Sequence, residues 1–300
     1  MTKLVRFDWA IKYLLRNKAN FDILEGFLSE LLKTPIHIET ILESEGNKLD
    51  ANDKFNRVDL LVKTDKGQHI IIEVQCSSQW DYLSRILYGA SKVVCEYLRA
   101  GDAYKNIHKV ISVSIVFFNL GTGKDYLYHG NTVFRGLHYG DILGLNPHEQ
   151  AVYSTEHNPL IETPEKIFPE YYLIKVTQFH EQVRDKLDEW IYFLKHGEIK
   201  QEFSAQGIRS AAEKLNTLHL NEEQRRVYAH YQEALHDEAS LNEMFRVIKQ
   251  EGETEGEARG EAKGRLLERQ QIAKSLKQAG LSDQQIAEGT GLSMEEIRKL

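Results

Sequence analysis

Residues 56–79 contain the pattern that most constrains how this chain folds. Two apolar runs, at 58–62 and 70–74, are rich in Val, Leu and Ile, which alternate with other side chains. Between the runs lies the turn sequence Thr64-Asp65-Lys66-Gly67. Two runs with period two around an Asp/Gly turn predict a β-hairpin.

Two carboxylates lie within this predicted hairpin. Asp59 is in the first run, and Glu73 is in the second, on the same strand face as Gln75. Glu73 ends the run Ile70–Ile72, which has the pattern of a strand buried on both faces. A buried carboxylate there is costly unless it is paired or binds a metal. Both acids could instead be polar residues on a half-solvated sheet, but the pattern favours one hard cation held between them.

The order Asp, hairpin turn, Glu-x-Lys resembles the active-site pattern of the PD-(D/E)XK nucleases, with Gln75 where lysine is usual. The wider chain, over about residues 1–200, resembles one branch of that superfamily, the recombination-promoting nuclease/putative transposase family. The segments that carry this resemblance are Asp8-Trp9-Ala10-Ile11-Lys12, Asp59, Glu73-Val74-Gln75, Arg85 with Tyr88, Gly101 with Tyr104, and Asp188-Glu189-Trp190.

The resemblance implies an α/β fold with a mixed β-sheet flanked by helices, a restriction-endonuclease-like core, followed by a helical C-terminal region. It also implies a Mg²⁺-dependent DNA endonuclease, with Mn²⁺ or Ca²⁺ as substitute ions. Asp59, Glu73 and the backbone carbonyl of Val74 would hold the metal, and Gln75 would orient water. The alternative is a nuclease-fold protein that does not cut and instead binds DNA or partner chains.

An amide at position 75 cannot supply the positive charge of a lysine, although related nuclease groups place Gln there. Lys12, Lys63 or Arg85 could supply that charge instead. In many of these nucleases the first helix adds one more acid, for which Asp8 and Glu25 are the candidates. Either acid could instead be a solvated helix charge.

Arg85 and Tyr88 are three residues apart and share one face of a predicted helix. The planar guanidinium of Arg85 suits a phosphate near the metal, which makes this pair, with Lys63, a candidate phosphate-binding group. The alternative is a surface arginine packed over a tyrosine.

The remaining helices and strands are predicted from hydrophobic periodicity and from the residues that begin or end such elements. We expect helices at 7–15, 21–32, 77 or 78 to 99 and 183–195, strands at 36–43, 110–119 and 126–134, a polar loop at 45–54, and an extended segment at 163–176. The third helix would have Ser77 or Ser78 as its N-cap. Its predicted buried face comprises Leu83, Ile86, Leu87, Ala90, Val94 and Leu98.

The C-terminal part differs in composition from the rest. We divide the chain into a nuclease-like domain at 1–200, a helical region at 201–250, a Gly/Glu-rich linker or helix at 251–264 and a small helical module at 265–300. Glycine recurs every fourth residue from Gly252 to Gly264, which is compatible with a partner-stabilised helix or with a flexible tether.

Residues 265–300 resemble a bacterial helix-turn-helix, with capping boxes beginning at Ser282 and Ser293. From Ser282 onward, however, four acids outnumber two basic residues, whereas a recognition helix normally carries Lys or Arg facing the phosphates. We therefore favour a module for homo-oligomerisation or docking. Met244 is the only methionine between the first residue and Met294, so a separately translated C-terminal fragment is conceivable.

Charge and composition exclude several classes. The net charge of −7 indicates that DNA, the expected partner, would meet a local basic surface, not a uniformly positive protein. The two cysteines, Cys76 and Cys95, are expected to be reduced thiols. No secretory signal is evident, and the longest apolar run, at 110–118, is too short to span a membrane. We expect a soluble, cytoplasmic protein.

Overall fold

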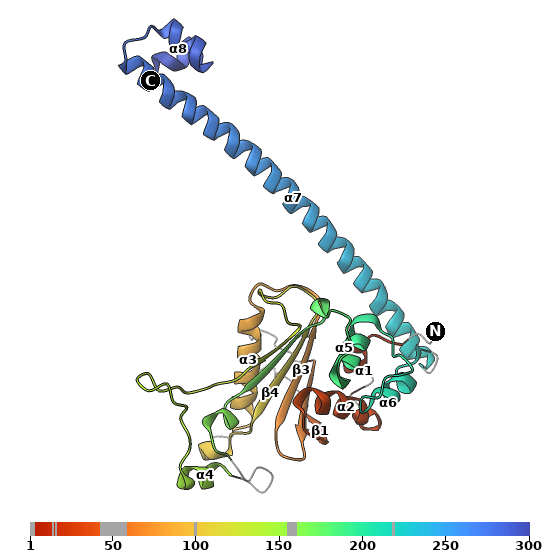
Figure 1. Ribbon diagram of the computed structural model, residues 1–300. Helices are drawn as coiled ribbons and strands as arrows, with labels where there is room; N and C mark the ends of the chain where they lie inside the picture. The colour runs from red at the N-terminus through yellow and green to blue at the C-terminus, as the bar shows by residue number, and fades with distance from the viewer. Residues whose placement is uncertain are drawn as a thin grey trace. The chain divides into compact units, whose positions relative to one another are not determined.

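The computed structural model describes residues 4–13, 15, 17–42, 59–98, 101–154, 161–217 and 220–300 (Figure 1). The predicted loop at 45–54 lies outside this range. The chain divides into two compact units, Met1–Tyr228 and Ala229–Leu300.

The first unit is built on a mixed β-sheet with six strands among the described residues, in the order β1-β2-β3-β4-β6-β5. The strands are β1 (Ile38–Leu42), β2 (Leu60–Thr64), β3 (His69–Gln75), β4 (Val110–Val116), β5 (Leu127–Gly130) and β6 (Glu170–Lys175). β1, β2 and β3 pair antiparallel, β3, β4 and β6 pair parallel, and β5 is an antiparallel edge strand. The predicted α/β fold with a mixed sheet is confirmed.

The predicted hairpin is also confirmed. β2 pairs with β3 in a register that places Leu60 opposite Ile72 and Lys63 opposite His69. Gly67 has a φ of 75°, a left-handed conformation that glycine adopts without strain and that closes the turn. Every residue from His69 to Val74 is buried, because helices cover both faces of this strand.

The helices of the first unit lie on both sides of the sheet (Figure 1). They are α1 (Phe7–Tyr13), α2 (Phe21–Leu32), α3 (Tyr82–Glu96), α4 (Pro147–Tyr153), α5 (Lys186–His196), α6 (Ile208–Lys214) and the start of α7 (Glu222–Gln278). α3 covers one face, whereas α1, α2 and α5 cover the other. Edge-to-face contacts of Phe7, Phe27, Trp190 and Phe193 join these three helices.

The predicted N-cap of α3 is wrong, and its predicted buried face is confirmed as buried only at Ile86 and Ala90. The helix begins at Tyr82, after Asp81, so neither Ser77 nor Ser78 is its N-cap; residues 77–81 instead lead the chain from β3 to the helix. Its buried residues are Tyr82, Ile86, Gly89, Ala90 and Val93. Leu83 and Leu87 are 63% and 59% exposed. The ring of Tyr82 packs at the start of the helix against Val116 and Phe118, which sets the helix rotation.

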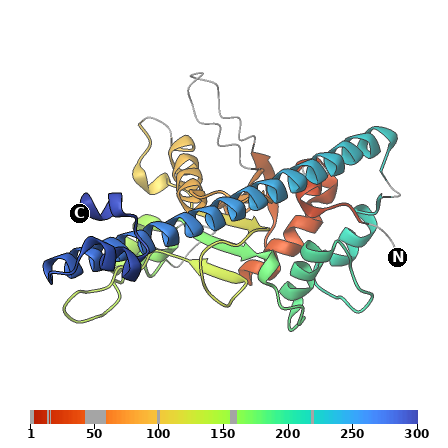
Figure 2. The ribbon, with the colours of Figure 1, turned by 90° about the horizontal axis from the view of Figure 1, so that it is seen from above.

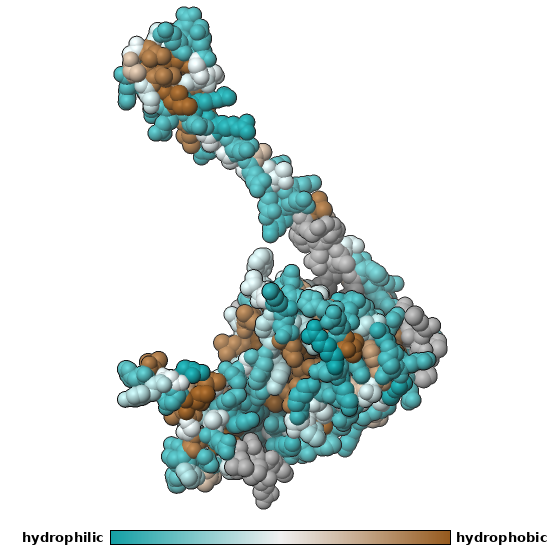
Figure 3. All heavy atoms as spheres, viewed as in Figure 1, coloured by the Kyte–Doolittle hydropathy of each residue, from teal (hydrophilic) through white to brown (hydrophobic). Residues whose placement is uncertain are grey.

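The second unit contains most of α7, which runs without a break in both ribbon views (Figures 1 and 2). The segment Glu251–Gly264 lies inside this helix. α8 (Asp283–Thr290) and α9 (Met294–Arg298) follow, each with a capping box, at Ser282 and Ser293 as the sequence predicts. Ala273, Ile286, Leu292 and Ile297 form a small core there. Apolar surface gathers at this tip, while most of α7 is polar (Figure 3).

None of the helices among the described residues combines the length and the apolar character needed to cross a membrane.

Candidate functional site

Asp59 and Glu73 meet at one end of the β2–β3 hairpin. Continuing the register beyond the Leu60–Ile72 pair brings Asp59 opposite Glu73, with both side chains on the same face. Oδ2 of Asp59 accepts a hydrogen bond of 2.8 Å from the backbone N–H of Val74. Glu73 is only 5% exposed. The sheet therefore places two carboxylates and the Val74 backbone together.

Arg85 of α3 reaches the buried carboxylate directly. Its Nη2 lies 2.5 Å from Oε1 of Glu73, and its Nη1 donates to Oε1 of Gln79 at 3.1 Å. The guanidinium side chain is 28% exposed, so it bridges the buried acid and the surface. Tyr88, the other member of the predicted phosphate-binding pair, is 47% exposed on the same helix.

Two further buried polar groups surround Glu73. Ser114 of β4 is the register partner of Glu73 and is 1% exposed, and Tyr82 of α3 is fully buried. Burial, and then the charge of Glu73, raise the pKa of the Tyr82 hydroxyl well above its usual value. Tyr82 is thus a neutral hydroxyl at physiological pH. Neither residue is recognisable as a site residue in the sequence, since Ser114 lies in an otherwise apolar strand and Tyr82 resembles an ordinary core aromatic.

Gln75 is half-buried at the end of β3, and its Nε2 donates to the carbonyl of Ser77 at 3.2 Å. In the parallel register Gln75 aligns with Val116, and Val116 aligns with Lys175 of β6, so all three side chains project from one face. Lys175 is 1% exposed, and its Nζ has no hydrogen-bond partner among the described residues. This amine lies 5.4 Å from the centre of the Tyr128 ring.

Lys175 was not a candidate in the sequence. The sequence shows only that Lys175 ends the run Glu170–Lys175. The alignment of Lys175 with Gln75 depends on the long-range pairing of β4 with β6.

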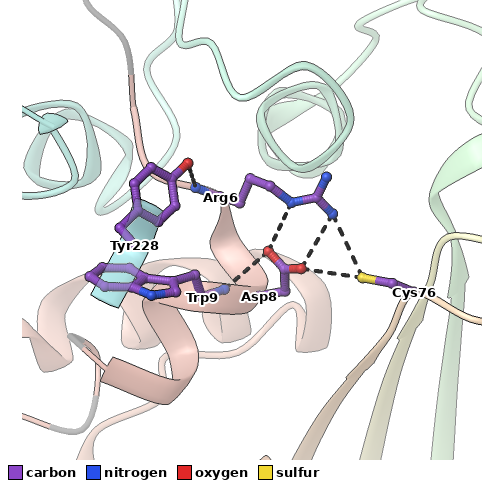
Figure 4. A network of polar contacts seen from close by, with 5 residues as sticks. All are labelled: Arg6, Asp8, Trp9, Cys76 and Tyr228. Atoms are coloured by element: carbon purple, nitrogen blue, oxygen red, sulfur yellow. Dashed lines mark hydrogen bonds and ion pairs between the residues drawn. The ribbon is translucent and has the colours of Figure 1, made fainter. Parts of the chain in front are cut away.

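Asp8 lies close to the end of β3 but is occupied by other contacts (Figure 4). Arg6 binds both of its oxygens, with Nε–Oδ1 and Nη2–Oδ2 distances of 3.2 Å and 3.3 Å. The thiol of Cys76, the residue after Gln75, contacts Oδ2 at 3.2 Å, and the N–H of Trp9 donates to Oδ1 at 3.0 Å. Asp8 is 2% exposed. This network anchors α1 beside the strand that carries Gln75.

Glu25 is not brought to the site. Its Oε1 accepts a 2.7 Å hydrogen bond from the N–H of Ile38. Ile38 pairs with Thr64, at the end of β2 away from Asp59. Glu25 therefore connects α2 to the start of β1.

Lys63 is also distant from the two carboxylates. It lies opposite His69, and its Nζ forms an ion pair of 2.8 Å with Oε2 of Glu39. Lys63 is four residues from Asp59, roughly 13 Å along a strand. The backbone of Lys12 is part of α1, but its side chain lies outside the described part of the structure.

The donor set around Asp59 suits a hard cation. The two carboxylates and the Val74 backbone offer oxygen atoms, the ligands that Mg²⁺ and Ca²⁺ prefer, and Mg²⁺ usually keeps several waters as well. Within the described residues, no group of three or more His, Cys, Asp and Glu side chains gathers at one place. Asp59 and Glu73 are therefore not joined by a third such side chain from the described part of the chain. A metal site made of these two carboxylates, the Val74 carbonyl and water molecules fits the residues present.

Comparison with known proteins finds a family match within this unit. Residues 5–135 match the family described as PD-(D/E)XK nuclease family transposase, which confirms the resemblance inferred from the motifs. The match includes α1, the hairpin, α3 and β4, and hence Asp59, Glu73, Gln75 and Arg85. No curated protein and no solved structure matches the chain.

Proposed function

Because residues 5–135 match the family described as PD-(D/E)XK nuclease family transposase, we propose that this protein is a divalent-metal-dependent DNA endonuclease. One observation carries the proposal above all others. Asp59 and the buried Glu73 lie side by side at the end of the hairpin, two residues from Gln75. Arg85 offsets the charge of Glu73, but two adjacent carboxylates carry one negative charge more than this arginine, and a cation that both acids bind would offset it.

Asp59, Glu73 and the Val74 carbonyl would hold Mg²⁺, with Mn²⁺ or Ca²⁺ as substitute ions. When bound, such an ion polarises a phosphoryl group and lowers the pKa of a coordinated water. The hydrogen bond from the Val74 N–H fixes the orientation of the Asp59 carboxylate before any ion arrives. Ser114 is the register partner of Glu73, and the buried Tyr82 lies near enough for the charge of Glu73 to raise the pKa of its hydroxyl.

Gln75 and Arg85 would act on the substrate side of the site. The amide nitrogen of Gln75 is bound to Ser77, so its amide oxygen is the group left to accept a hydrogen bond from the attacking water. Arg85 presents a planar guanidinium, suited to a phosphate, and its charge takes the place of the missing lysine. Tyr88 lies one turn further along α3 and would contact the DNA backbone from its exposed position.

The family match is to transposase-type nucleases, so we place the biological role in DNA recombination or movement of a mobile element, with phage defence as a further candidate. The direct test is nicking of supercoiled plasmid by purified protein in Mg²⁺ and in EDTA. Gln75→Ala should lower the metal-dependent rate by about 10²-fold, the scale of a lost proton-transfer or water-orienting group, whereas Gln75→Lys should preserve or raise it. If the protein binds DNA but does not cleave it in Mg²⁺, Mn²⁺ or Ca²⁺, the result would instead support the non-catalytic alternative.

We further propose that the C-terminal region joins copies of this chain. Leu241, Met244, Val247 and Ile248 of α7 are between 43% and 55% exposed and recur at helical spacing, which gives the helix an apolar stripe. A Cβ added to any of the four glycines from Gly252 to Gly264 would meet no other atom within 4 Å, so that stretch has room for a closely packed second helix. The acidic α8 and α9 favour protein over DNA as the partner.

The position of Met244 inside α7 bears on the separately translated fragment. A fragment of residues 244–300 would retain more than half of α7 together with α8 and α9. We propose that such a fragment would form mixed oligomers with the full chain through the same stripe and thereby regulate the nuclease. Sedimentation of this fragment above its monomer mass would support that role.

A further inference from the structure

A recess lies at the opposite end of the hairpin from Glu73. Its volume is about 1140 Å³, and its walls come from the β2–β3 turn, the end of α3, and residues 102–109 and 166–172. His69, at the start of β3, is part of its lining and lies on the same strand face as Glu73. Four residues, roughly 13 Å, separate the two along β3, and α3 packs on the sheet face between them. The recess is therefore distinct from the candidate catalytic end.

His69 contributes an unusual polar atom to this recess. The side chain is 2% exposed, and its Nδ1 has no hydrogen-bond partner among the described residues. The rings of Tyr97 and His108 lie 4.5 Å and 4.8 Å from it, measured between centroids. Burial, and then the charges of His108 and Lys63, lower the pKa of His69 to about 4. The imidazole is neutral at pH 7, and its surroundings disfavour a further positive charge.

The cations around the recess fall into two groups. Lys109 is structural, since its Nζ binds Oε2 of Glu170 at 3.2 Å and two backbone carbonyls. Lys66, Lys105 and Lys166, in contrast, are exposed, and none of them is paired with a carboxylate in the described part of the chain. Three lysines that form no ion pair with a described carboxylate thus line one recess.

The acids of the recess do not cancel this charge. They are Glu96, Asp102 and Glu170. Glu170 is held ionised: although burial alone would raise its pKa, the Tyr172 hydroxyl, Lys109 and His129 lower it below the usual value. With Lys63 paired to Glu39 and Lys109 to Glu170, the lining retains three lysines against the two acids Glu96 and Asp102, an excess of one positive charge.

We propose that this recess binds the phosphate of a nucleotide, at a site separate from the Asp59–Glu73 end. The three lysines without a described carboxylate partner supply the positive charge that a phosphate requires. The aromatic rings of Tyr97 and His108 at the same wall offer surfaces on which a base can stack. A recess of this volume holds a mononucleotide or a dinucleotide. The ligand is either a free nucleotide that acts as an effector or a terminal nucleotide of a DNA strand.

Binding to the full-length protein in EDTA tests the proposal, because EDTA removes any contribution of the metal site. Calorimetry measures the binding of four probes. They are ATP, a 5′-phosphorylated dinucleotide, a 5′-phosphorylated single-stranded oligonucleotide and inorganic phosphate. The test variant is Lys66→Gln/Lys105→Gln/Lys166→Gln. The matched control is Lys18→Gln/Lys124→Gln/Lys186→Gln, which removes the same charge from exposed lysines outside the recess. All six positions are on the surface, so both variants should fold.

We expect one saturable site in the wild type, affinity lowered roughly tenfold or more in the recess variant, and a change below about twofold in the control. Tightest binding of ATP or the dinucleotide would identify a free effector, and tightest binding of the oligonucleotide would identify a DNA end. The proposal is overturned if no probe binds saturably, or if the two triple variants weaken binding equally. Neither result depends on whether the protein cleaves DNA.

Discussion

Arg85 and Glu73 form an ion pair of 2.5 Å that joins α3 to β3. The acid is almost fully buried, whereas the arginine still reaches the surface. One contact thus neutralises a buried charge and places a guanidinium at the mouth of the candidate metal site. The same position serves two purposes: it stabilises the fold without metal, and it presents a cation to an incoming phosphate.

Replacing Arg85 separates these purposes. Arg85→Ala removes the arginine charge beside the buried Glu73, and should lower the free energy of unfolding in EDTA by on the order of 3 kcal/mol. Adding Mn²⁺ should restore part of this loss, because the ion replaces the missing charge at Glu73. Denaturant unfolding with and without Mn²⁺ measures both effects. Arg184→Ala, at an exposed arginine, should change neither. Loss of stability that Mn²⁺ does not restore would argue against metal binding at Glu73.

Asp8 provides a second test, because the sequence left its role open. Its oxygens accept from Arg6, Cys76 and Trp9 in the structure. Asp8→Asn keeps the shape but loses the charge, and should lower the free energy of unfolding by about 1 kcal/mol while metal-dependent cleavage persists. Parallel measurements of stability and nicking rate decide the matter. Loss of cleavage at unchanged stability would show that Asp8 is the additional acid of the catalytic site.

The buried His69 predicts a dependence of stability on pH. Its pKa is about 4 in the folded protein, against 6.5 ordinarily, so between these values the unfolded chain binds a proton that the folded chain does not. Stability is therefore lost as the pH falls through this window. From pH 7 to pH 5 the contribution of His69 amounts to about 2 kcal/mol. Urea unfolding of the wild type and His69→Asn at both pH values should show that difference. Equal losses in the two proteins would show that His69 is not the titrating group.

Association through α7 predicts opposite effects of one substitution on the monomer and on the oligomer. Gly256→Ala and Gly260→Ala have room in a single chain, where each should stabilise the helix by ~1 kcal/mol. In an oligomer whose helices touch at these glycines, the added methyl groups should instead lower the association constant. Sedimentation equilibrium of the full-length variants, with circular dichroism as the folding control, measures both. Higher helicity with unchanged association would exclude the glycine face as the contact.

Local patterns were sufficient to predict much of the fold. The hairpin follows from period-two alternation around Asp65 and Gly67, and α5 ends at Gly197 because glycine accepts the left-handed conformation there. The rotation of α3 could not be predicted in this way. That helix carries two apolar stripes, and the stripe that faces the sheet is chosen by contacts of Tyr82 with Val116 and Phe118, more than thirty residues away.

The candidate site was predictable only where its residues share the hairpin. Asp59, Glu73 and Gln75 are placed by one local register, so their proximity follows from the sequence. Glu25 could not be placed, because a helix face does not reveal which end of the sheet it meets. The alignment of Lys175 with Gln75 and the recess at His69 both depend on parallel pairing across β4, which no local pattern encodes.

The most direct measurement is the rate of Mg²⁺-dependent plasmid cleavage by Glu73→Gln and Asp59→Asn beside Glu25→Gln. All three variants exchange a carboxylate for an amide of nearly the same shape, and Glu25 lies at the other end of the sheet, where it accepts a hydrogen bond from Ile38. We expect cleavage to fall at least 10³-fold in the first two, as for loss of a group essential to the chemistry, and to stay within about twofold in the third. Full activity in folded Glu73→Gln or Asp59→Asn protein would contradict the assignment of these carboxylates to the metal site.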